Sequence, residues 1–123
     1  MVLLVLPNAF SPTLCAGLVS LHSASPTRQT GQMREVDGKT VEVLDPAVKR
    51  RRDLFLHPDD RAARPIWSAV CRNILPAANP AFGLEITRLE RHLVGLYDAE
   101  EGWHFGLHRD DTLPGTRHRK VAL

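Results

Sequence analysis

The sequence predicts an α+β fold in which helices pack on an antiparallel sheet. Two stretches in the first two thirds of the chain carry apolar residues every three to four positions, the period of a helix. Apolar and polar residues alternate around an Asp-Gly pair and again toward the C-terminal end. With 123 residues and 43% hydrophobic side chains, the chain suits a single domain over residues 1–123.

The N-terminal elements are expected to be a strand and a helix. Residues 1–6 form an apolar run that predicts a buried strand. The run lacks a basic leader and is too short for an export signal or a membrane span, because Pro7 interrupts it. Ser11 and Pro12 then provide an N-cap and a first-turn proline for a helix. Its apolar stripe consists of Leu14, Leu18 and Leu21.

The middle of the chain predicts a hairpin and a second helix. Residues 33–44 alternate around Asp37-Gly38, the pair that favours a tight hairpin turn. The second helix is expected to begin at Asp59 or Asp60 and to end before Pro76. Its inner face would consist of Ile66, Trp67, Val70, Ile74 and Leu75.

The last third is expected to be mainly extended. Asn79 and Pro80 indicate the connection that leaves the second helix. Residues 84–97 follow an imperfect period of two, which predicts a long strand segment. Residues 117–123 are expected to begin another strand.

Charge and cysteine content limit the partners. A formal net charge of +2 does not indicate a nucleic acid partner, and no segment indicates a membrane partner. The basic run at residues 49–52 predicts a solvated turn or the approach to a helix, since Asp53 dilutes its field. Cys15 and Cys71 have no Cys-x-x-Cys spacing, so we expect reduced, semi-buried cysteines and a cytoplasmic location.

His108 and Asp110 are the residues that indicate chemistry. On a strand, side chains at i and i+2 share one face, with Cα atoms roughly 6 to 7 Å apart. Metal bonds of about 2.0 to 2.2 Å allow both side chains to reach one cation. One His and one Asp are two of the three ligands in the facial triad that holds non-haem Fe(II). The alternative is a surface hydrogen-bonded pair.

The residues around this pair carry a family resemblance. Tyr97, Gly102 and Phe105 precede His108-Arg109-Asp110, and the turn at residues 112–116 and the restart at residues 117–123 follow it. Residues 89–123 thereby resemble the first metal-bearing strand and following hairpin of the 2-oxoglutarate and Fe(II)-dependent oxygenases, with the prolyl 4-hydroxylase-like branch as the closest match. The resemblance implies that His108 and Asp110 are iron ligands and that Tyr97 contacts the carboxylate of 2-oxoglutarate.

The family implies a double-stranded β-helix (jelly roll) fold and a dioxygenase that uses Fe(II) as cofactor and 2-oxoglutarate as co-substrate. The substrate is unknown, either a protein side chain or a small molecule. The family's second His ligand and its basic 2-oxoglutarate-binding residue come on later strands than this chain contains. We therefore expect a truncated jelly roll, with an open sheet edge that favours self-association.

The third ligand and the function remain open at this point. His104, at i−4 from His108, and His118 are candidates for the third ligand. One alternative function is a non-catalytic module that binds zinc or nickel through His104, His108 and Asp110. The other is an inactive fragment in which His108 and Asp110 only form a hydrogen bond.

Overall fold

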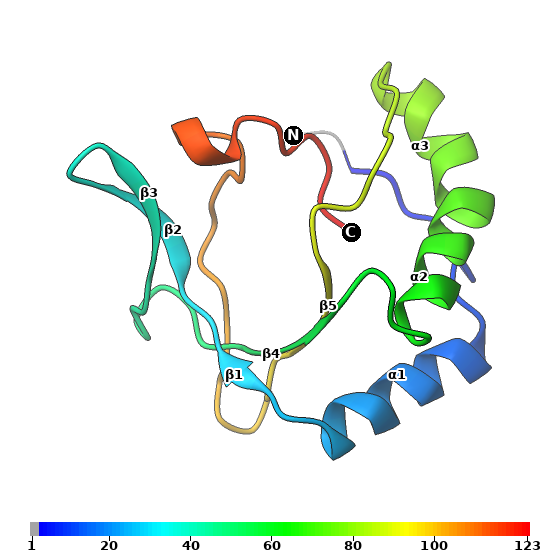
Figure 1. Cartoon of the computed structure of the whole chain (residues 1–123), viewed down its shortest axis with the longest axis horizontal. Coiled ribbons are helices and arrows are strands. Elements are labelled where there is room, and N and C mark those ends of the chain that lie inside the picture. The colour runs from blue at the N-terminus through cyan, green and yellow to red at the C-terminus, as the bar shows by residue number, and fades with distance from the viewer. Residues whose placement is uncertain (1–2) are drawn as a thin grey trace. The chain divides into compact units, whose positions relative to one another are not determined.

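The chain folds into helices and antiparallel strands in the computed structural model, which describes residues 3–123 (Figure 1). The predicted α+β class is confirmed. The elements are α1 (Pro12–Ala24), β1 (Arg28–Gln29), β2 (Gln32–Val36), β3 (Lys39–Val43), β4 (Arg52–Leu56), α2 (Ala63–Ala69), the π-helical turn η1 (Val70–Ile74), α3 (Leu75–Phe82), β5 (His92–Leu96) and the 3₁₀ turn η2 (Pro114–Thr116).

The chain divides into two compact units. Unit 1 comprises the chain up to Pro26 together with Phe55–Val94, and unit 2 comprises Thr27–Leu54 and Gly95–Leu123. Among residues 3–123, no helix has both the length and the apolar character needed to cross a membrane.

The first helix of unit 1 begins where its capping residues predict. The Oγ atom of Ser11 accepts a hydrogen bond from the Leu14 N–H at 3.1 Å, and Pro12 occupies the first turn. The strand predicted for residues 1–6 is wrong over residues 3–6, which have no regular structure, and the first two residues lie outside the described part. Leu4 and Leu6 pack against the core of unit 1, so side-chain burial takes the place of strand pairing.

The second helical stretch is longer than predicted. It begins at Ala63 and continues through α2, η1 and α3 to Phe82, so both predicted ends are wrong. Within η1, the Leu75 N–H bonds to the carbonyl of Val70, five residues back. The wide turn therefore falls just before Pro76, which has no N–H to donate and lies in the first turn of α3.

The C-terminal end of α3 lies at a glycine. Gly83 has a φ of 62°, the left-handed conformation common after a helix, and the Leu84 N–H bonds to the Asn79 carbonyl at 3.0 Å. Asn79 and Pro80, expected in a connection, are therefore helical. The side chain of Asn79 also accepts a hydrogen bond from the Ile86 N–H at 3.1 Å, which turns the chain back toward the core. The predicted extended segment becomes a strand only at β5.

The core of unit 1 lies on one face of this helical stretch. Val70, Ile74 and Ala78 are buried at its centre. The partly buried residues around them are Leu4, Leu6, Ala9, Phe10, Trp67, Leu75, Phe82, Ile86 and Leu89. Four of the five residues predicted for the inner face therefore belong to this cluster. Cys15 and Cys71 are free but exposed, so their predicted semi-burial is wrong.

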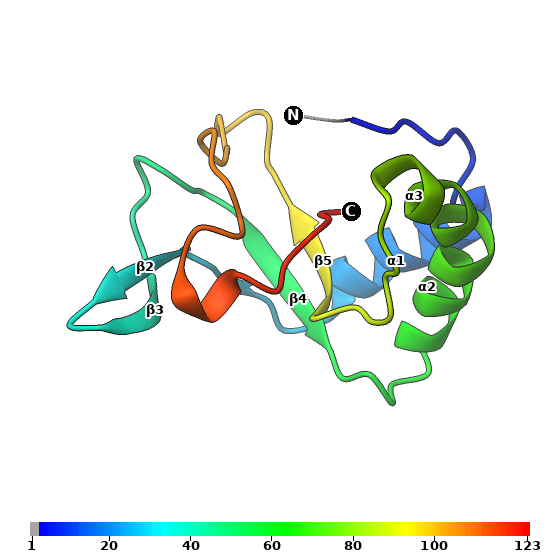
Figure 2. The same cartoon turned by 90° about the horizontal axis from the view of Figure 1, so that it is seen from above.

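Unit 2 contains the predicted hairpin. Strands β2 and β3 pair antiparallel from Gln32 opposite Val43 to Val36 opposite Lys39 (Figure 2). Asp37 and Gly38 have φ values of 50° and 74°, as a two-residue hairpin turn with left-handed residues requires. At the other end of the unit, the strand expected for residues 117–123 does not form. The preceding turn, η2, instead contacts β3, where the Gly115 N–H donates to Thr40 Oγ1 at 3.1 Å.

A second sheet has the order β1-β4-β5, with β4 in the centre. Strand β1 pairs antiparallel with β4, and Arg28 lies opposite Asp53. The expectation that residues 49–52 form a solvated turn or lead into a helix is therefore wrong, because Arg52 begins β4 and Lys49 is only 5% exposed. Lys49 Nζ donates to the Gly31 carbonyl at 2.8 Å.

Polar side chains form the centre of unit 2. Asp53 is 1% exposed and accepts hydrogen bonds at Oδ2 from Thr30 Oγ1 and from Arg51 Nη2, both at 2.7 Å. Arg51 Nε also lies 2.6 Å from Oδ1, a charge contact without hydrogen-bond geometry. Burial opposes the charge of Arg51, but its bonds to Asp53 and Tyr97 outweigh burial and raise the pKa of the guanidinium.

Candidate metal site

The segment that carries His108 is held by a short antiparallel contact within unit 2. Phe105 and Lys49 form a β-bridge. On either side of it, the Arg50 N–H donates to the His104 carbonyl and the Gly106 N–H donates to the Val48 carbonyl, each at 2.7 Å. This pairing ends at Gly106, two residues before the candidate ligand.

His108 and Asp110 lie in an irregular segment that leads into a turn, so the prediction that they share one face of a strand is wrong. The backbone beyond Gly106 has no strand partner, and Leu107 is 94% exposed. The two side chains nevertheless converge, with His108 Nε2 at 3.4 Å from Asp110 Oδ1. Arg109 points elsewhere and approaches Asp111 at 3.4 Å.

The ring of His108 is oriented by two further contacts. Its Nδ1 lies 2.7 Å from the Gly106 carbonyl, which can only accept, so we assign the ring proton to Nδ1. Phe105 stacks on the imidazole with ring centroids 3.7 Å apart and planes 21° from parallel. Lys49 Nζ lies 4.8 Å from the centroid of the Phe105 ring. In the neutral ring with its proton on Nδ1, the lone pair of Nε2 faces Asp110.

This geometry suits two ligands of one divalent metal ion. A separation of 3.4 Å is long for a hydrogen bond between a nitrogen and an oxygen. Two atoms bound to one ion at about 2.1 Å are about 3.0 Å apart at a right angle and about 3.4 Å apart at the tetrahedral angle. Metal-bound histidines commonly donate their other ring N–H to a carbonyl, as His108 does. The pair therefore fits a metal ion, although it provides only two ligands.

The third ligand is not found nearby. His104 lies 3.1 Å through Nε2 from the Ala47 carbonyl and 3.1 Å through Nδ1 from the Gly102 carbonyl. These two bonds, the one to Ala47 first, raise the pKa of His104, because only the imidazolium has two N–H donors. Both ring nitrogens of His104 therefore face backbone carbonyls, which argues against the binding module that uses His104 as a ligand. Within the part of the chain that the structure describes, no three His, Cys, Asp or Glu side chains form a ligand set.

Tyr97, the residue expected at 2-oxoglutarate, directly follows β5 and is 43% exposed. Its hydroxyl oxygen accepts a hydrogen bond from Arg51 Nη1 at 3.3 Å, and the guanidinium carbon lies 5.7 Å from the ring centroid. Since the oxygen accepts from Arg51, the phenolic proton remains available to donate to another acceptor.

The residues that orient the site were not found from the sequence. Lys49 lies far from Phe105 along the chain, and its burial contradicts the usual behaviour of a basic run. The carbonyl of Gly106 has no sequence signal, because every residue has one.

Comparisons with protein-family models, with curated proteins and with solved structures gave no match to this chain. The residues of the chain and their geometry therefore carry its functional assignment.

Proposed function

We propose that His108 and Asp110 are two protein ligands of an Fe(II) ion and that the chain is part of a 2-oxoglutarate-dependent dioxygenase. One observation supports this most: Nε2 of His108, with Nδ1 bonded to the Gly106 carbonyl, faces the carboxylate of Asp110 at 3.4 Å. A neutral imidazole beside a carboxylate is the ligand pair of the facial triad in oxygenases of this kind.

The residues of the chain have separate tasks in this proposal. Asp110 supplies negative charge to the metal, and the stacked Phe105 with the Gly106 carbonyl keeps His108 in its ligating orientation. Tyr97 donates its phenolic proton to a carboxylate oxygen of 2-oxoglutarate, while Arg51 holds the hydroxyl in place. When bound, Fe(II) and 2-oxoglutarate would supply the chemistry for hydroxylation with dioxygen as the oxidant: one oxygen atom enters a C–H group of an unidentified protein side chain or small molecule, and the other enters succinate as 2-oxoglutarate loses CO2.

The remaining parts of the site belong to the same proposal. A jelly roll completed by later strands supplies the second His ligand and the basic residue for 2-oxoglutarate, so the chain is the N-terminal part of that fold. Two free cysteines, Cys15 and Cys71, favour a reducing, cytoplasmic location. Strand β5 is at the edge of its sheet, and Leu96 is 44% exposed there, which favours self-association.

A non-catalytic metal-binding module is a second candidate. It is favoured by the absence of a three-residue ligand set among residues 3–123. Two protein ligands bind a metal weakly and leave most coordination positions to water. Such a site can bind a metal ion without catalysing a reaction. The two candidates predict different spectra.

The test is anaerobic titration with Fe(II), followed by 2-oxoglutarate. We expect Fe(II) to bind and 2-oxoglutarate to produce the weak visible charge-transfer band of a chelated 2-oxo acid. His108→Ala should abolish both signals, whereas His57→Ala should not, although His57 also precedes an Asp by two residues. Iron uptake without the band favours the binding module. Equal behaviour of wild type and His108→Ala contradicts both candidates.

A further inference from the structure

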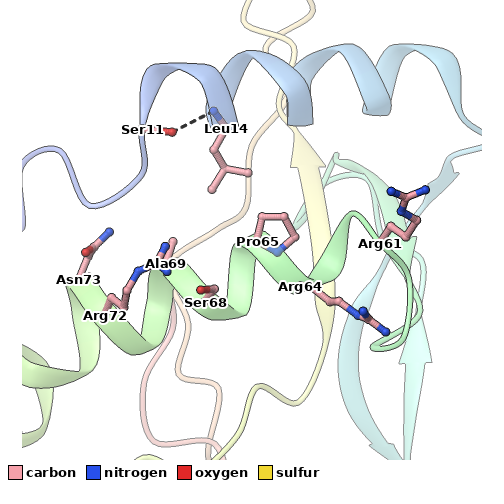
Figure 3. Close-up of a pocket in the computed structure, with 9 residues that line it drawn as sticks. All are labelled: Ser11, Leu14, Arg61, Arg64, Pro65, Ser68, Ala69, Arg72 and Asn73. Carbon is pink, nitrogen blue, oxygen red and sulfur yellow. Dashed lines mark hydrogen bonds between the residues drawn. The ribbon is translucent and has the colours of Figure 1, made fainter.

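Unit 1 contains an open groove with a volume of about 550 Å³ (Figure 3). It lies between the first turn of α1 and one face of α2 and η1. Three arginines line it, Arg61, Arg64 and Arg72, and no Asp or Glu does. The groove is therefore positive, although the whole chain has a net charge of only +2.

The three arginines differ from several arginines of unit 2 in having no acidic partner among the described residues. Arg28, Arg34 and Arg51 form ion pairs of 2.6 to 2.9 Å with carboxylates of their own unit. No carboxylate within residues 3–123 pairs with Arg61, Arg64 or Arg72, and all three are exposed. Their charges are therefore available to an anionic ligand.

The spacing of the arginines indicates an extended ligand. Arg61 and Arg64 lie toward one end of the groove and Arg72 toward the other (Figure 3). Eight residues of helix separate Arg64 from Arg72, which corresponds to about 12 Å along the axis. Four residues of extended peptide span about 13 Å, which matches this rise along the helix.

The floor of the groove favours a peptide over a nucleic acid. Between the charged ends, Leu14 comes from α1 and Pro65 and Ala69 come from α2, so an apolar surface separates the arginines. No aromatic side chain lines the groove, and single-stranded nucleic acids are normally held by base stacking on such side chains. Ser68, between Arg64 and Arg72, provides a hydroxyl for a backbone hydrogen bond.

We propose that this groove binds an extended acidic peptide segment of a partner protein. One carboxylate meets Arg64, and a second carboxylate about four residues away meets Arg72, while Arg61 adds positive charge at the Arg64 end. Guanidinium groups bind carboxylates through two parallel N–H···O bonds, which sets the direction of each acidic side chain. An apolar side chain between the two acids covers Leu14, Pro65 and Ala69. The proposal is independent of the metal site.

Fluorescence anisotropy of the full chain with labelled peptides tests it. The probe is an extended, otherwise uncharged peptide with one leucine between two Glu residues four positions apart. The matched control peptide has Gln at both positions. We expect the acidic peptide to bind and the control not to bind. The affinity should fall as NaCl is raised from about 0.05 to about 0.3 M, because the shorter Debye length screens the exposed charge pairs.

Variants connect the binding to the groove. Arg64→Gln combined with Arg72→Gln should weaken the acidic peptide roughly fivefold to tenfold, as expected from the loss of two exposed charge pairs. Arg88→Gln, an exposed arginine of the same unit outside the groove, should leave the affinity unchanged. All three side chains are exposed, and circular dichroism verifies that each variant keeps its fold.

Three results would overturn the proposal. The first is equal binding of the Glu and Gln peptides. The second is equal weakening by Arg88→Gln and by the double variant. The third is displacement of the labelled peptide by single-stranded RNA or pyrophosphate at lower concentration than by the unlabelled peptide, which would make the groove a phosphate site.

Discussion

Two His-x-Asp sequences in this chain have the same spacing but different geometry. In unit 2, Nε2 of His108 faces Asp110 at 3.4 Å, and the side chains are 37% and 42% exposed. In unit 1, Nδ1 of His57 faces Asp59 at 3.5 Å, and the side chains are 71% and 88% exposed. The distances are nearly equal, so distance does not distinguish the two pairs.

The second contact of each ring distinguishes them. Nδ1 of His57, the nitrogen beside the carboxylate, already accepts a hydrogen bond from the Asp59 N–H at 3.3 Å. In neutral His108, the Nδ1–H donates to the Gly106 carbonyl, and Nε2, the nitrogen beside the carboxylate, has the lone pair. A ligand pair therefore depends on what holds the far side of the imidazole, and the spacing of His and Asp alone does not create it.

The largest expected effect is on the free energy of unfolding, which should depend much more on the polar centre of unit 2 than on the carboxylate beside His57. Asp53→Asn leaves the half-buried Arg51 without its charge partner in unit 2, which should lower the free energy of unfolding by about 3 kcal/mol. Asp59→Asn, beside His57, removes an exposed carboxylate and should change it by less than about 0.5 kcal/mol. Urea unfolding measures both values. Similar midpoints for the two variants would show that the polar centre of unit 2 contributes little.

Local signals explain what could be predicted of the fold. The cap at Ser11 and the Asp37-Gly38 turn each depend on residues within a few positions, and both are confirmed. The end of the second helix was wrong because Pro76 is accommodated by the π-helical turn before it, which has no clear sequence signature. Burial of Lys49 depends on Gly31 and Phe105, distant in sequence, so no local pattern could indicate it.

For the candidate site, the sequence indicated which two residues lie together, but the structure brings them together in a different way from the one predicted. The sequence predicted that His108 and Asp110 lie together on a strand; they lie close together, but the strand does not form, and their role as metal ligands stays a prediction. The orientation of the ring depends on a backbone carbonyl and on the stack with Phe105, both set by the contact between residues 48–50 and 104–106. The imidazole contacts of His104, which remove it as a ligand, depend on the same fold.

A smaller effect is expected on Fe(II) affinity when the aromatic ring that stacks on His108 is removed. Phe105→Leu removes the ring that lies on His108 but keeps an apolar side chain, so Fe(II) affinity should fall roughly threefold to tenfold. Phe105→Tyr keeps the stacked ring and should bind Fe(II) with the affinity of wild type. Isothermal titration under anaerobic conditions gives the values. An unchanged affinity in Phe105→Leu would leave the Gly106 carbonyl as the sole orienting contact.

The smallest expected effect is a pH dependence in the segment that leads to His108. His104 bonds to the Ala47 and Gly102 carbonyls through both ring nitrogens, and its folded-state pKa is raised above the value of about 6.5 expected in the unfolded chain. Its protonated form therefore stabilises the fold fully below pH 6.5, and this contribution is lost as pH rises through the raised pKa. His104→Gln cannot titrate and should lose less stability than wild type between pH 5.5 and pH 8, measured by urea midpoints. Because the same loop carries His108 and not His57, equal slopes in wild type and His104→Gln would mean that the two carbonyls do not select the imidazolium.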